Sequence, residues 1–479
     1  MRSLSASPAT CRSTWKRAWS NPPPEVKRES VSGQGAHTVS VAPPFEAYWR
    51  SDRPGAAWAA PCFVTANEPG IGGRIKERPE DFLVEEIPLY EPCGSGEHLY
   101  LFVQKRNLST LEMVRIVAEH FGVHRSAVGY AGLKDKHAIT RQVVSVHLPG
   151  KSDSEFRHLD HERLAVLWAD RHTNKLRPGH LRGNRFSIRV RGVEPTAALA
   201  ASRMIGMLAR VGVPNRVGEQ RFGLLENNHL IGRAMILGRM REAADLLLGP
   251  SASHPESQPE ARTFYAEGRY AAAAAHFAPA LRTERGLAKA LAKGLEVEKA
   301  VRRIDRTVAS YFVSAFQSAV FNSVLDRRIH DGQLGTLHIG DVAFRHVGRA
   351  TFDVTAETLG KAETHERVAS FEISPSGPMW GASMRQASGT PGRIERVALE
   401  AAGVTFERVA EFDRGTGGLM RGARRPLRVP LIDPDVEGGA DEHGTFVRCA
   451  FELPRGSFAT VVMRELMKTK LGGEEEVEE

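Results

Sequence analysis

Strand-like sequence stands near both ends of this chain, and a long helical stretch separates the two. Short β-rich runs occur at 82–84, 98–103, 143–146, 186–191 and 445–452. Between about 212 and 420 the chain is rich in alanine and charge, with five alanines at 271–275 and an amphipathic stretch at about 296–329. We therefore expect an α+β fold in which one domain is built from both ends of the chain and is interrupted by an inserted, helix-rich domain.

Composition and periodicity divide the chain into five segments. Residues 1–60 are rich in Ser, Pro, Arg and Ala without sustained periodicity, which predicts a disordered basic leader. Residues 61–211 and 421–470 are predicted to form the two parts of the α+β domain, and residues 212–420 the insertion. Residues 471–479 are an acidic tail, which we expect to be solvated.

A helix with clear end signals follows the second predicted strand. Ser109-Thr-Leu-Glu112 has the spacing of a capping box, and Gly122 offers a C-cap twelve residues after Thr110. A polar loop, 134–140, then precedes the β-branched run at 143–146. This loop is therefore expected to be held between ordered elements.

Charge and cysteine usage limit the partners and the compartment. Lys and Arg exceed Asp and Glu by 65 to 57, a net charge of +8, which is compatible with a polyanionic partner but does not establish one. The four cysteines are far apart without a C-x-x-C pair, which argues against a zinc ribbon, an iron–sulfur cluster or a disulfide framework and favours a reducing cytoplasm. We expect no membrane association and no export, because no apolar run reaches the length of a spanning helix and the N-terminal residues lack the apolar core of a secretory signal.

Most of the residues that could take part in catalysis lie in one loop. Gly132-Leu-Lys-Asp-Lys-His-Ala-Ile-Thr-Arg-Gln142 places one carboxylate, Asp135, between Lys134 and Lys136. Flanking cations favour the ionised carboxylate, which can act as nucleophile or base on a substrate whose phosphates the same cations bind. On the pattern alone, a solvated turn with local ion pairs is the commoner explanation. The motifs of nucleotide hydrolases, serine hydrolases, zinc proteases and dinucleotide-binding enzymes are absent from the sequence, and we predict no metal.

This loop resembles the signature of the TruD family of tRNA pseudouridine synthases. Five further blocks agree with the family in the same order, so that the resemblance extends from about 70 to 470. They are Ile75-Lys-Glu-Arg-Pro-Glu-Asp-Phe-Leu-Val-Glu85, Lys175-Leu-Arg-Pro-Gly-His-Leu-Arg-Gly-Asn-Arg-Phe186, Gly212-Val-Pro-Asn-Arg-Val-Gly-Glu-Gln-Arg-Phe-Gly223, Ser314-Ala-Phe-Gln-Ser-Ala-Val-Phe-Asn322 and Leu453-Pro-Arg-Gly-Ser-Phe-Ala-Thr-Val-Val-Met-Arg-Glu-Leu466.

The resemblance implies a pseudouridine-synthase-type catalytic domain, an inserted TRUD domain and an isomerase that acts on tRNA at uridine 13 without metal or organic cofactor. Asp135 would be the catalytic aspartate, attacking the anomeric carbon or removing a ribose proton, and the sequence leaves this choice open. The target uridine would have to be flipped out of its stack. We further expect a monomer.

The resemblance also implies a set of substrate-binding residues. Phe82 and Phe458 would line the uracil pocket, Asn184 would hydrogen-bond to substrate and Phe186 would pack against the base. Lys76 matches a basic position near the site. Phosphate contacts are expected from Lys134, Arg177, Arg182 and Arg221. Two alternatives remain open: the same chemistry on another RNA, and a non-catalytic RNA-binding protein.

Overall fold

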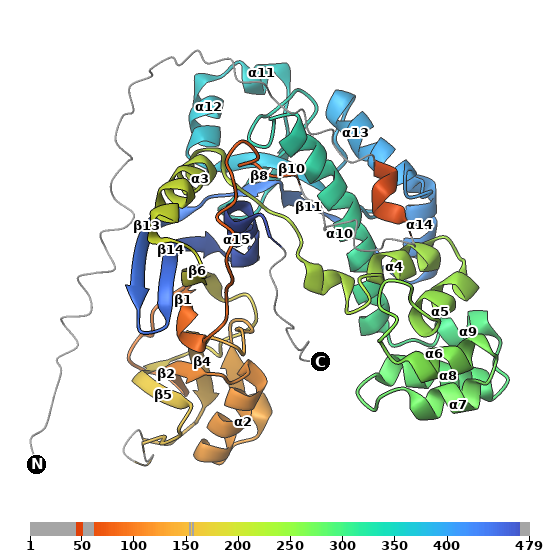
Figure 1. Cartoon of the computed structure of the whole chain (residues 1–479), viewed down its shortest axis with the longest axis horizontal. Helices are drawn as coiled ribbons and strands as arrows, with labels where there is room; N and C mark the ends of the chain where they lie inside the picture. The colour runs from red at the N-terminus through yellow and green to blue at the C-terminus, as the bar shows by residue number, and fades with distance from the viewer. Residues whose placement is uncertain (1–44, 51–61, 153–154, 156–157, 470–479) are drawn as a thin grey trace, which may run out of the picture. The chain divides into compact units, whose positions relative to one another are not determined.

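The main element is an eight-stranded sheet in a computed structural model that describes residues 45–50, 62–152, 155 and 158–469. The strand order is β13-β14-β6-β1-β4-β2-β5, with β3 paired to β4 (Figure 1). β1 and β4 are parallel, and the other neighbouring strands of this sheet are antiparallel. The strands are β1 (Phe82–Pro88), β2 (His98–Arg106), β3 (Val128–Tyr130), β4 (Ile139–His147), β5 (Leu164–His172), β6 (Leu181–Arg191), β13 (Ile432–Asp441) and β14 (Gly444–Pro454).

Strands from the two ends of the chain are direct neighbours in this sheet. β14 pairs with β6 over nine residues, with Phe451 opposite Phe186, and β13 continues the sheet beyond β14. The predicted α+β class, with one sheet built from both ends of the chain, is therefore confirmed.

Helix α2 (Thr110–Phe121) covers one end of the sheet. The Ser109 hydroxyl accepts a hydrogen bond from the backbone N–H of Glu112 at 3.1 Å, and the Glu112 carboxylate accepts one from the N–H of Ser109 at 2.9 Å. Gly122 ends the helix in the left-handed conformation, with φ of 63°. The predicted capping box and C-cap are thus confirmed, and the apolar face of α2 packs on β2 and β4.

Helices α3 (Ala198–Val211) and α15 (Ala459–Met467) form a second core on the sheet, away from α2. Their buried side chains pack with the residues of β1, β6 and β14 that share one face, among them Phe82, Val84, Phe186 and Phe451. The short helices η3 (Pro79–Asp81), η4 (Arg125–Ala127) and η6 (Pro195–Ala197) complete the connections of this part.

The opposite face of β6 carries Arg185, Arg189 and Arg191, and all three are paired with carboxylates. Arg191 is buried at 3% exposure, and its guanidinium pairs with Asp81 and Asp441, at 2.6 Å to each. Arg189 also pairs with Asp441, at 3.1 Å. Acidic residues distant in sequence thus neutralise the two cations nearest the end of the strand.

The inserted region combines helices with a second sheet. Its helices are η7 (Glu219–Phe222), α4 (Asn228–Ile236), α5 (Met240–Leu248), α6 (Pro259–Ala266), α7 (Tyr270–His276), α8 (Arg282–Ala292), α9 (Val297–Val301), α10 (Arg306–His330), α11 (Ala356–Leu359), α12 (Ala362–Ala369), α13 (Gly389–Glu400) and α14 (Phe406–Gly415). The four-stranded sheet has the order β11-β10-β8-β9, from β8 (Val342–Arg345), β9 (Thr351–Asp353), β10 (Ile373–Met379) and β11 (Ala423–Pro426), and β7 (Val213–Pro214) pairs with β12 (Arg428–Val429). The region is helix-rich as expected, but the sheet was not predicted.

Helix α10 is the core helix of the insertion. It is the one helix among the described residues that is long and apolar enough to cross a membrane, yet 72% of its most apolar window is buried inside the protein. Such burial is typical of a core helix rather than a membrane span.

The predicted boundary at residue 420 cuts through the second sheet. β11 lies after this boundary and pairs with β10, with Gly377 opposite Arg425. β12 lies after it as well and pairs with β7. The hydrogen-bonded structure of the insertion therefore extends to Val429, and the division into domains stays a prediction.

A short helix, η2 (Phe45–Trp49), lies within the predicted disordered leader. Tyr48 and Trp49 are buried, the Tyr48 hydroxyl donates a hydrogen bond to Asp326 of α10, and the Trp49 and Phe316 rings are 5.3 Å apart. These residues are therefore ordered by the insertion, contrary to the prediction. The rest of the leader up to 60, except Arg50, and the acidic tail lie outside the described residues.

Candidate active site

Asp135 lies in the loop that connects β3 to β4, as the sequence predicted for residues between ordered elements. Its side chain is 32% exposed, so that solvent or a substrate can reach the carboxylate. The Lys76 ammonium lies 3.0 Å from Asp135 Oδ1, although the two residues are 59 positions apart. The side chain of Lys76 is 11% exposed, so this ion pair stands at the border between the protein interior and the surface.

The backbone of the Asp135 loop is fixed by a lysine that sequence reasoning missed. Lys105 is fully buried on β2, and its ammonium donates to the carbonyls of Leu108, Lys134 and Asp135, the last at 2.8 Å. A signal existed, because the alternation of Leu99, Leu101 and Val103 continues to residue 105 and places it on the inner face.

Further hydrogen bonds hold both ends of the same loop. The Lys134 N–H donates to the Thr110 hydroxyl at 2.9 Å, and the Gly179 N–H donates to the carbonyl of Ala131 at 2.7 Å. At the other end, the Asn107 N–H donates to the carbonyl of Ala138 at 3.2 Å. The position of Asp135 is thus set by α2, β2 and the segment before β6.

Lys76 reaches Asp135 from a strained backbone. Its φ of 60° is left-handed, which costs a β-carbon-bearing residue about 1 kcal/mol. Two hydrogen bonds between Arg74 and Arg191 fix the preceding residues to β6, and the Lys76 ammonium lies 4.7 Å from the centre of the Phe82 ring. Phe82 itself is buried at 2% exposure, so its ring supports Lys76 from the core.

Asn184 and Phe186 stand two residues apart on β6 and share the face of Val84. The side-chain oxygen of Asn184 is buried, and no residue of the described chain forms a hydrogen bond with it. The Phe186 ring is buried and lies 5.7 Å from the Phe451 ring. The sheet register places Asn184 opposite Glu86 and Leu453, so Asn184 is an acceptor that the surrounding described protein leaves unsatisfied.

Lys134 differs from its predicted role as a phosphate contact. Its ammonium forms a buried ion pair with Glu86 at 2.6 Å, and both side chains are at most 4% exposed. The other Glu86 oxygen accepts the N–H of Val143 at 3.3 Å. An ammonium in this place would have to break a buried pair to reach RNA, which is strongly unfavourable.

The remaining predicted residues are more accessible. Phe458 is 43% exposed and precedes the first residue of α15. Arg177 and Arg182 are exposed, and Arg221 is half-buried on η7. The structure therefore brings Lys76 against both Asp135 and Phe82, and it places Asn184 on a strand adjacent to that of Phe82.

Comparisons with known proteins identify the family. The sequence profile of "tRNA pseudouridine synthase D (TruD)" matches residues 60–466. The chain is 45% identical over 408 residues to tRNA pseudouridine synthase D of Geobacter sulfurreducens, covering 85% of this chain and 96% of the relative, and 44% identical to that of Geobacter metallireducens, covering 85% and 97%. The chain belongs to the TruD family of tRNA pseudouridine synthases.

A solved structure of the TruD family has a similar fold. The crystal structure of the Methanosarcina mazei protein described as tRNA pseudouridine synthase D matches with a TM-score of 0.74 and 30% identity, over 85% of this chain and 96% of that chain. The resemblance drawn from the six sequence blocks is confirmed. The pseudouridine-synthase-type fold with its inserted domain is confirmed as well.

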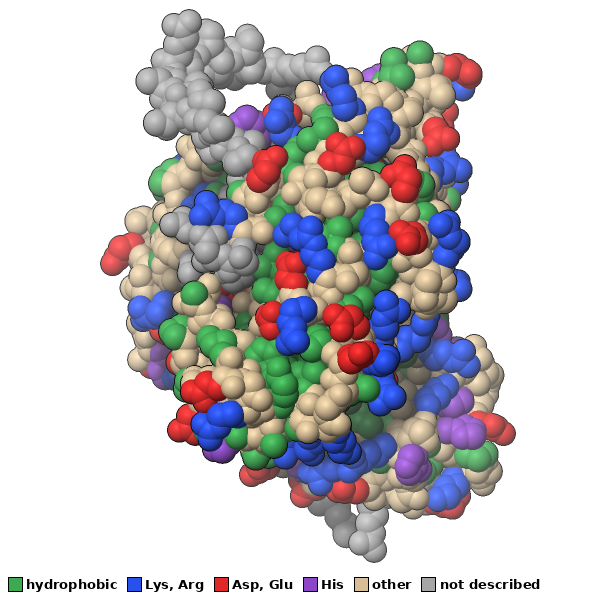
Figure 2. All heavy atoms as spheres, turned by 90° about the vertical axis from the view of Figure 1, so that its right-hand side faces the viewer, with side chains coloured by type: hydrophobic (Ala, Val, Ile, Leu, Met, Phe, Trp, Pro, Cys, Tyr) green, Lys and Arg blue, Asp and Glu red, His purple; other side chains and the backbone are tan. Residues whose placement is uncertain are grey.

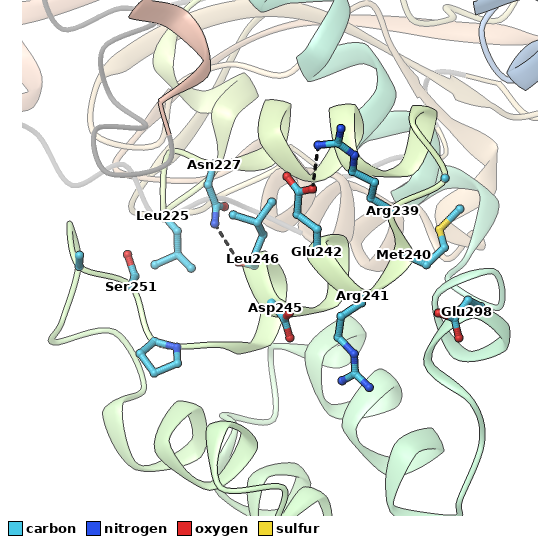
Figure 3. A pocket seen from close by; sticks show the side chains of 13 residues that line it. Leu225, Asn227, Arg239, Met240, Arg241, Glu242, Asp245, Leu246, Ser251 and Glu298 are labelled. Carbon is cyan, nitrogen blue, oxygen red and sulfur yellow. Dashed lines mark hydrogen bonds and ion pairs between the residues drawn. The ribbon is translucent and has the colours of Figure 1, made fainter. Parts of the chain in front are cut away.

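A cavity in the insertion lies apart from this TruD-family site. It has a volume of about 830 Å³ and is lined by the segments that flank α4, by α5 and the loop after it, and by Glu298 of α9 (Figure 3); none of the predicted site residues lines it. Arg239 and Glu242 at its edge form an ion pair at 3.5 Å, and the Asn227 amide donates to the carbonyl of Leu246 at 2.8 Å. Within the described ranges, no group of three or more His, Cys, Asp or Glu side chains is placed to hold a metal ion.

Proposed function

We propose that this chain converts uridine 13 of tRNA to pseudouridine, with Asp135 as the catalytic carboxylate. Membership of the TruD family supports the class of the reaction, the isomerisation of uridine in tRNA. The observation that carries the residue assignment is the accessible Asp135 carboxylate with its Lys76 partner at 3.0 Å. The loop that carries Asp135 is fixed by a buried ammonium, as a catalytic group requires.

The reaction balances without an external reagent. In one route an Asp135 oxygen bonds to the anomeric carbon while the bond to uracil N1 breaks, and the electron pair leaves with the base. The base rotates, its C5 bonds to the anomeric carbon and displaces the carboxylate, and the base loses its C5 proton and gains one at N1. In the other route Asp135 takes a ribose proton as the base departs and returns it when the new bond forms. No electrons enter or leave, so neither route needs an external oxidant or reductant.

The uracil must leave its stack to reach Asp135, because the anomeric carbon of a stacked nucleotide is inaccessible. The unsatisfied Asn184 oxygen suits an N–H group of the flipped uracil. The exposed ring of Phe458 supplies an apolar wall, and the buried ring of Phe82 packs against the Lys76 ammonium. In this arrangement Phe186 does not touch the base directly. It packs on Phe451 in the core and so stabilises the strand that carries Asn184.

We also propose that residues 212–420 supply a second, basic wall for the folded tRNA, and that the enzyme acts as a cytoplasmic monomer. The described cysteines Cys62, Cys93 and Cys449 are all free thiols, which fits a reducing compartment. The molar mass of the purified chain, measured by light scattering with and without tRNA, tests whether the protein is a monomer.

Pseudouridine mapping at single-nucleotide resolution tests the proposal. Unmodified tRNA transcripts and total RNA are incubated with wild type, with Asp135→Asn, and with Asp160→Asn as a control that changes an exposed carboxylate in another loop. Wild type and the control should form pseudouridine at position 13, and Asp135→Asn should form none. Modification at other RNA positions would support the same chemistry on another target. Equal RNA binding by all three proteins without any pseudouridine would support a non-catalytic RNA-binding protein instead.

A further inference from the structure

One arginine contacts the loop that leads to Phe458, and the charges of two further arginines from separate segments act on it. They are Arg221 on η7, Arg349 in the turn between β8 and β9, and Arg425 on β11, and we call them the arginine cluster. The Arg425 guanidinium donates to the Asn215 side-chain oxygen at 2.6 Å and to the carbonyl of Gly456 at 3.2 Å, so it joins the insertion to the loop before α15. Burial, followed by the charges of Arg349 and Arg221, lowers the pKa of Arg425 to about 10.

The cluster is unusual because its positive charge is not compensated within the described part of the chain. No carboxylate there forms an ion pair with Arg221, Arg349 or Arg425. The neighbouring Arg424, in contrast, pairs with Glu395 at 2.7 Å. On the face shown in Figure 2, Lys and Arg side chains are interspersed with Asp and Glu. Like charges held together without a counter-charge destabilise the protein alone, so their convergence points to an anionic ligand.

Arg349 occupies a backbone position that rarely holds arginine. Gly348 and Arg349 have φ of 78° and 59°, two successive left-handed residues in the tight turn of a hairpin. Gly and Asn are the residues that adopt this conformation most easily, and a longer side chain there costs about 1 kcal/mol. Arg349 is exposed at this tip, and its charge acts on Arg425.

The loop beside the cluster holds an unsatisfied hydroxyl. Ser457 follows Gly456, which accepts from Arg425, and precedes the exposed Phe458. Its hydroxyl oxygen is buried, and no residue of the described chain forms a hydrogen bond with it. An unsatisfied hydroxyl one residue after the carbonyl that binds Arg425 is a donor suited to a phosphate oxygen.

Arg221 adds an aromatic surface to the cluster. Its guanidinium lies 4.7 Å from the centre of the Tyr311 ring, and its NH1 donates to the Ser314 hydroxyl at 3.1 Å. The Tyr311 hydroxyl donates to the carbonyl of Gln220 at 2.6 Å, which fixes the ring, and the side chain remains 36% exposed. Stacked arginine and aromatic side chains are typical of surfaces that bind single-stranded nucleic acid.

We propose that the arginine cluster and Ser457 bind backbone phosphates of the RNA strand next to the nucleotide that Asp135 modifies. This inference rests on the proposed function, because Phe458 connects the cluster to the uracil pocket. The cluster supplies the charge, Ser457 supplies a fixed donor, and Arg425 holds the loop that carries both Ser457 and Phe458. The ligand is thus a phosphodiester, read by charge and geometry and not by sequence.

The salt dependence of tRNA binding tests the inference. The variant is Arg221→Gln/Arg349→Gln, and the matched control is Arg115→Gln/Arg327→Gln, which removes two exposed arginines that pair with Glu119 and Asp331. The cluster variant should raise the Kd for tRNA about 10-fold and reduce the slope of log Kd against log salt by about 1.5, whereas the control should change the slope by less than about 0.5. Ser457→Ala should raise the KM about threefold without lowering kcat.

Each outcome decides one question. If the slope of log Kd against log salt for the cluster variant equals that of the control variant, the inference is overturned, whatever the activity of the enzyme. A loss of slope together with intact pseudouridine formation at saturating tRNA supports a phosphate site. If wild type forms no pseudouridine in any RNA, the proposed function fails, and a loss of slope would still establish the cluster as an RNA phosphate site.

Discussion

Substitution of Lys105 by Met tests whether the buried ammonium positions Asp135, the proposed catalytic carboxylate. Methionine preserves the length and most of the volume of the side chain but removes the donor to the carbonyls of Leu108, Lys134 and Asp135. A hydrogen bond to a charged group contributes about 1.5–3 kcal/mol. Two of the three carbonyls belong to the loop around Asp135, so the loss falls mainly on the position of the carboxylate.

The expected effect is large on the chemical step and small on RNA binding. A displacement of the reacting group by about 1 Å costs about 100-fold in rate, which corresponds to about 2.7 kcal/mol in the activation free energy. We therefore expect the single-turnover rate of Lys105→Met to fall about 100-fold. The Kd for tRNA should stay within about twofold of wild type, because Lys105 is fully buried and cannot touch RNA.

A second buried cation offers a matched control. Arg262 is buried in the insertion, and its guanidinium donates to the carbonyls of Leu247, Gly249 and Ser257 at 2.7–3.1 Å. Arg262→Met removes the same kind of interaction away from Asp135, so it should lower the free energy of unfolding without slowing catalysis. If Lys105→Met loses stability like Arg262→Met but keeps the rate of wild type within about twofold, the positioning argument is refuted.

Two further predictions concern buried charges. Lys134→Met leaves Glu86 charged and buried, so the free energy of unfolding, measured by urea titration, should fall by about 3–5 kcal/mol. The double variant Lys134→Met/Glu86→Gln should recover part of this loss of stability. No recovery would contradict the contribution of the ion pair. Burial lowers the pKa of His229 to about 3. Since an unfolded histidine takes up a proton below about pH 6.5, stability should fall with falling pH between these values, by up to about 1.4 kcal/mol per pH unit. The Tm of His229→Gln should depend less on pH there, and an unchanged pH dependence would exclude His229.

The elements that the sequence predicted correctly depend on short-range interactions. The capping box of α2 joins residues three positions apart, and the strands follow from alternation within a few residues. The loop around Asp135 was found because its charges are adjacent in sequence. The sheet of the insertion and the buried helix η2 were missed, because their short segments become ordered only through contacts with distant parts of the chain.

Local patterns and blocks in a fixed order were enough to predict the α+β class and the family, and to single out Asp135 as the proposed catalytic carboxylate. The partners of the cations around Asp135 became visible only in the folded structure. Lys134 stands beside Asp135 in sequence, yet it pairs with Glu86, whereas Lys76 and Lys105 reach the loop from afar. Burial makes the energy of a charge depend on the groups that surround it in space, and those groups come from strands that only the folded sheet brings together.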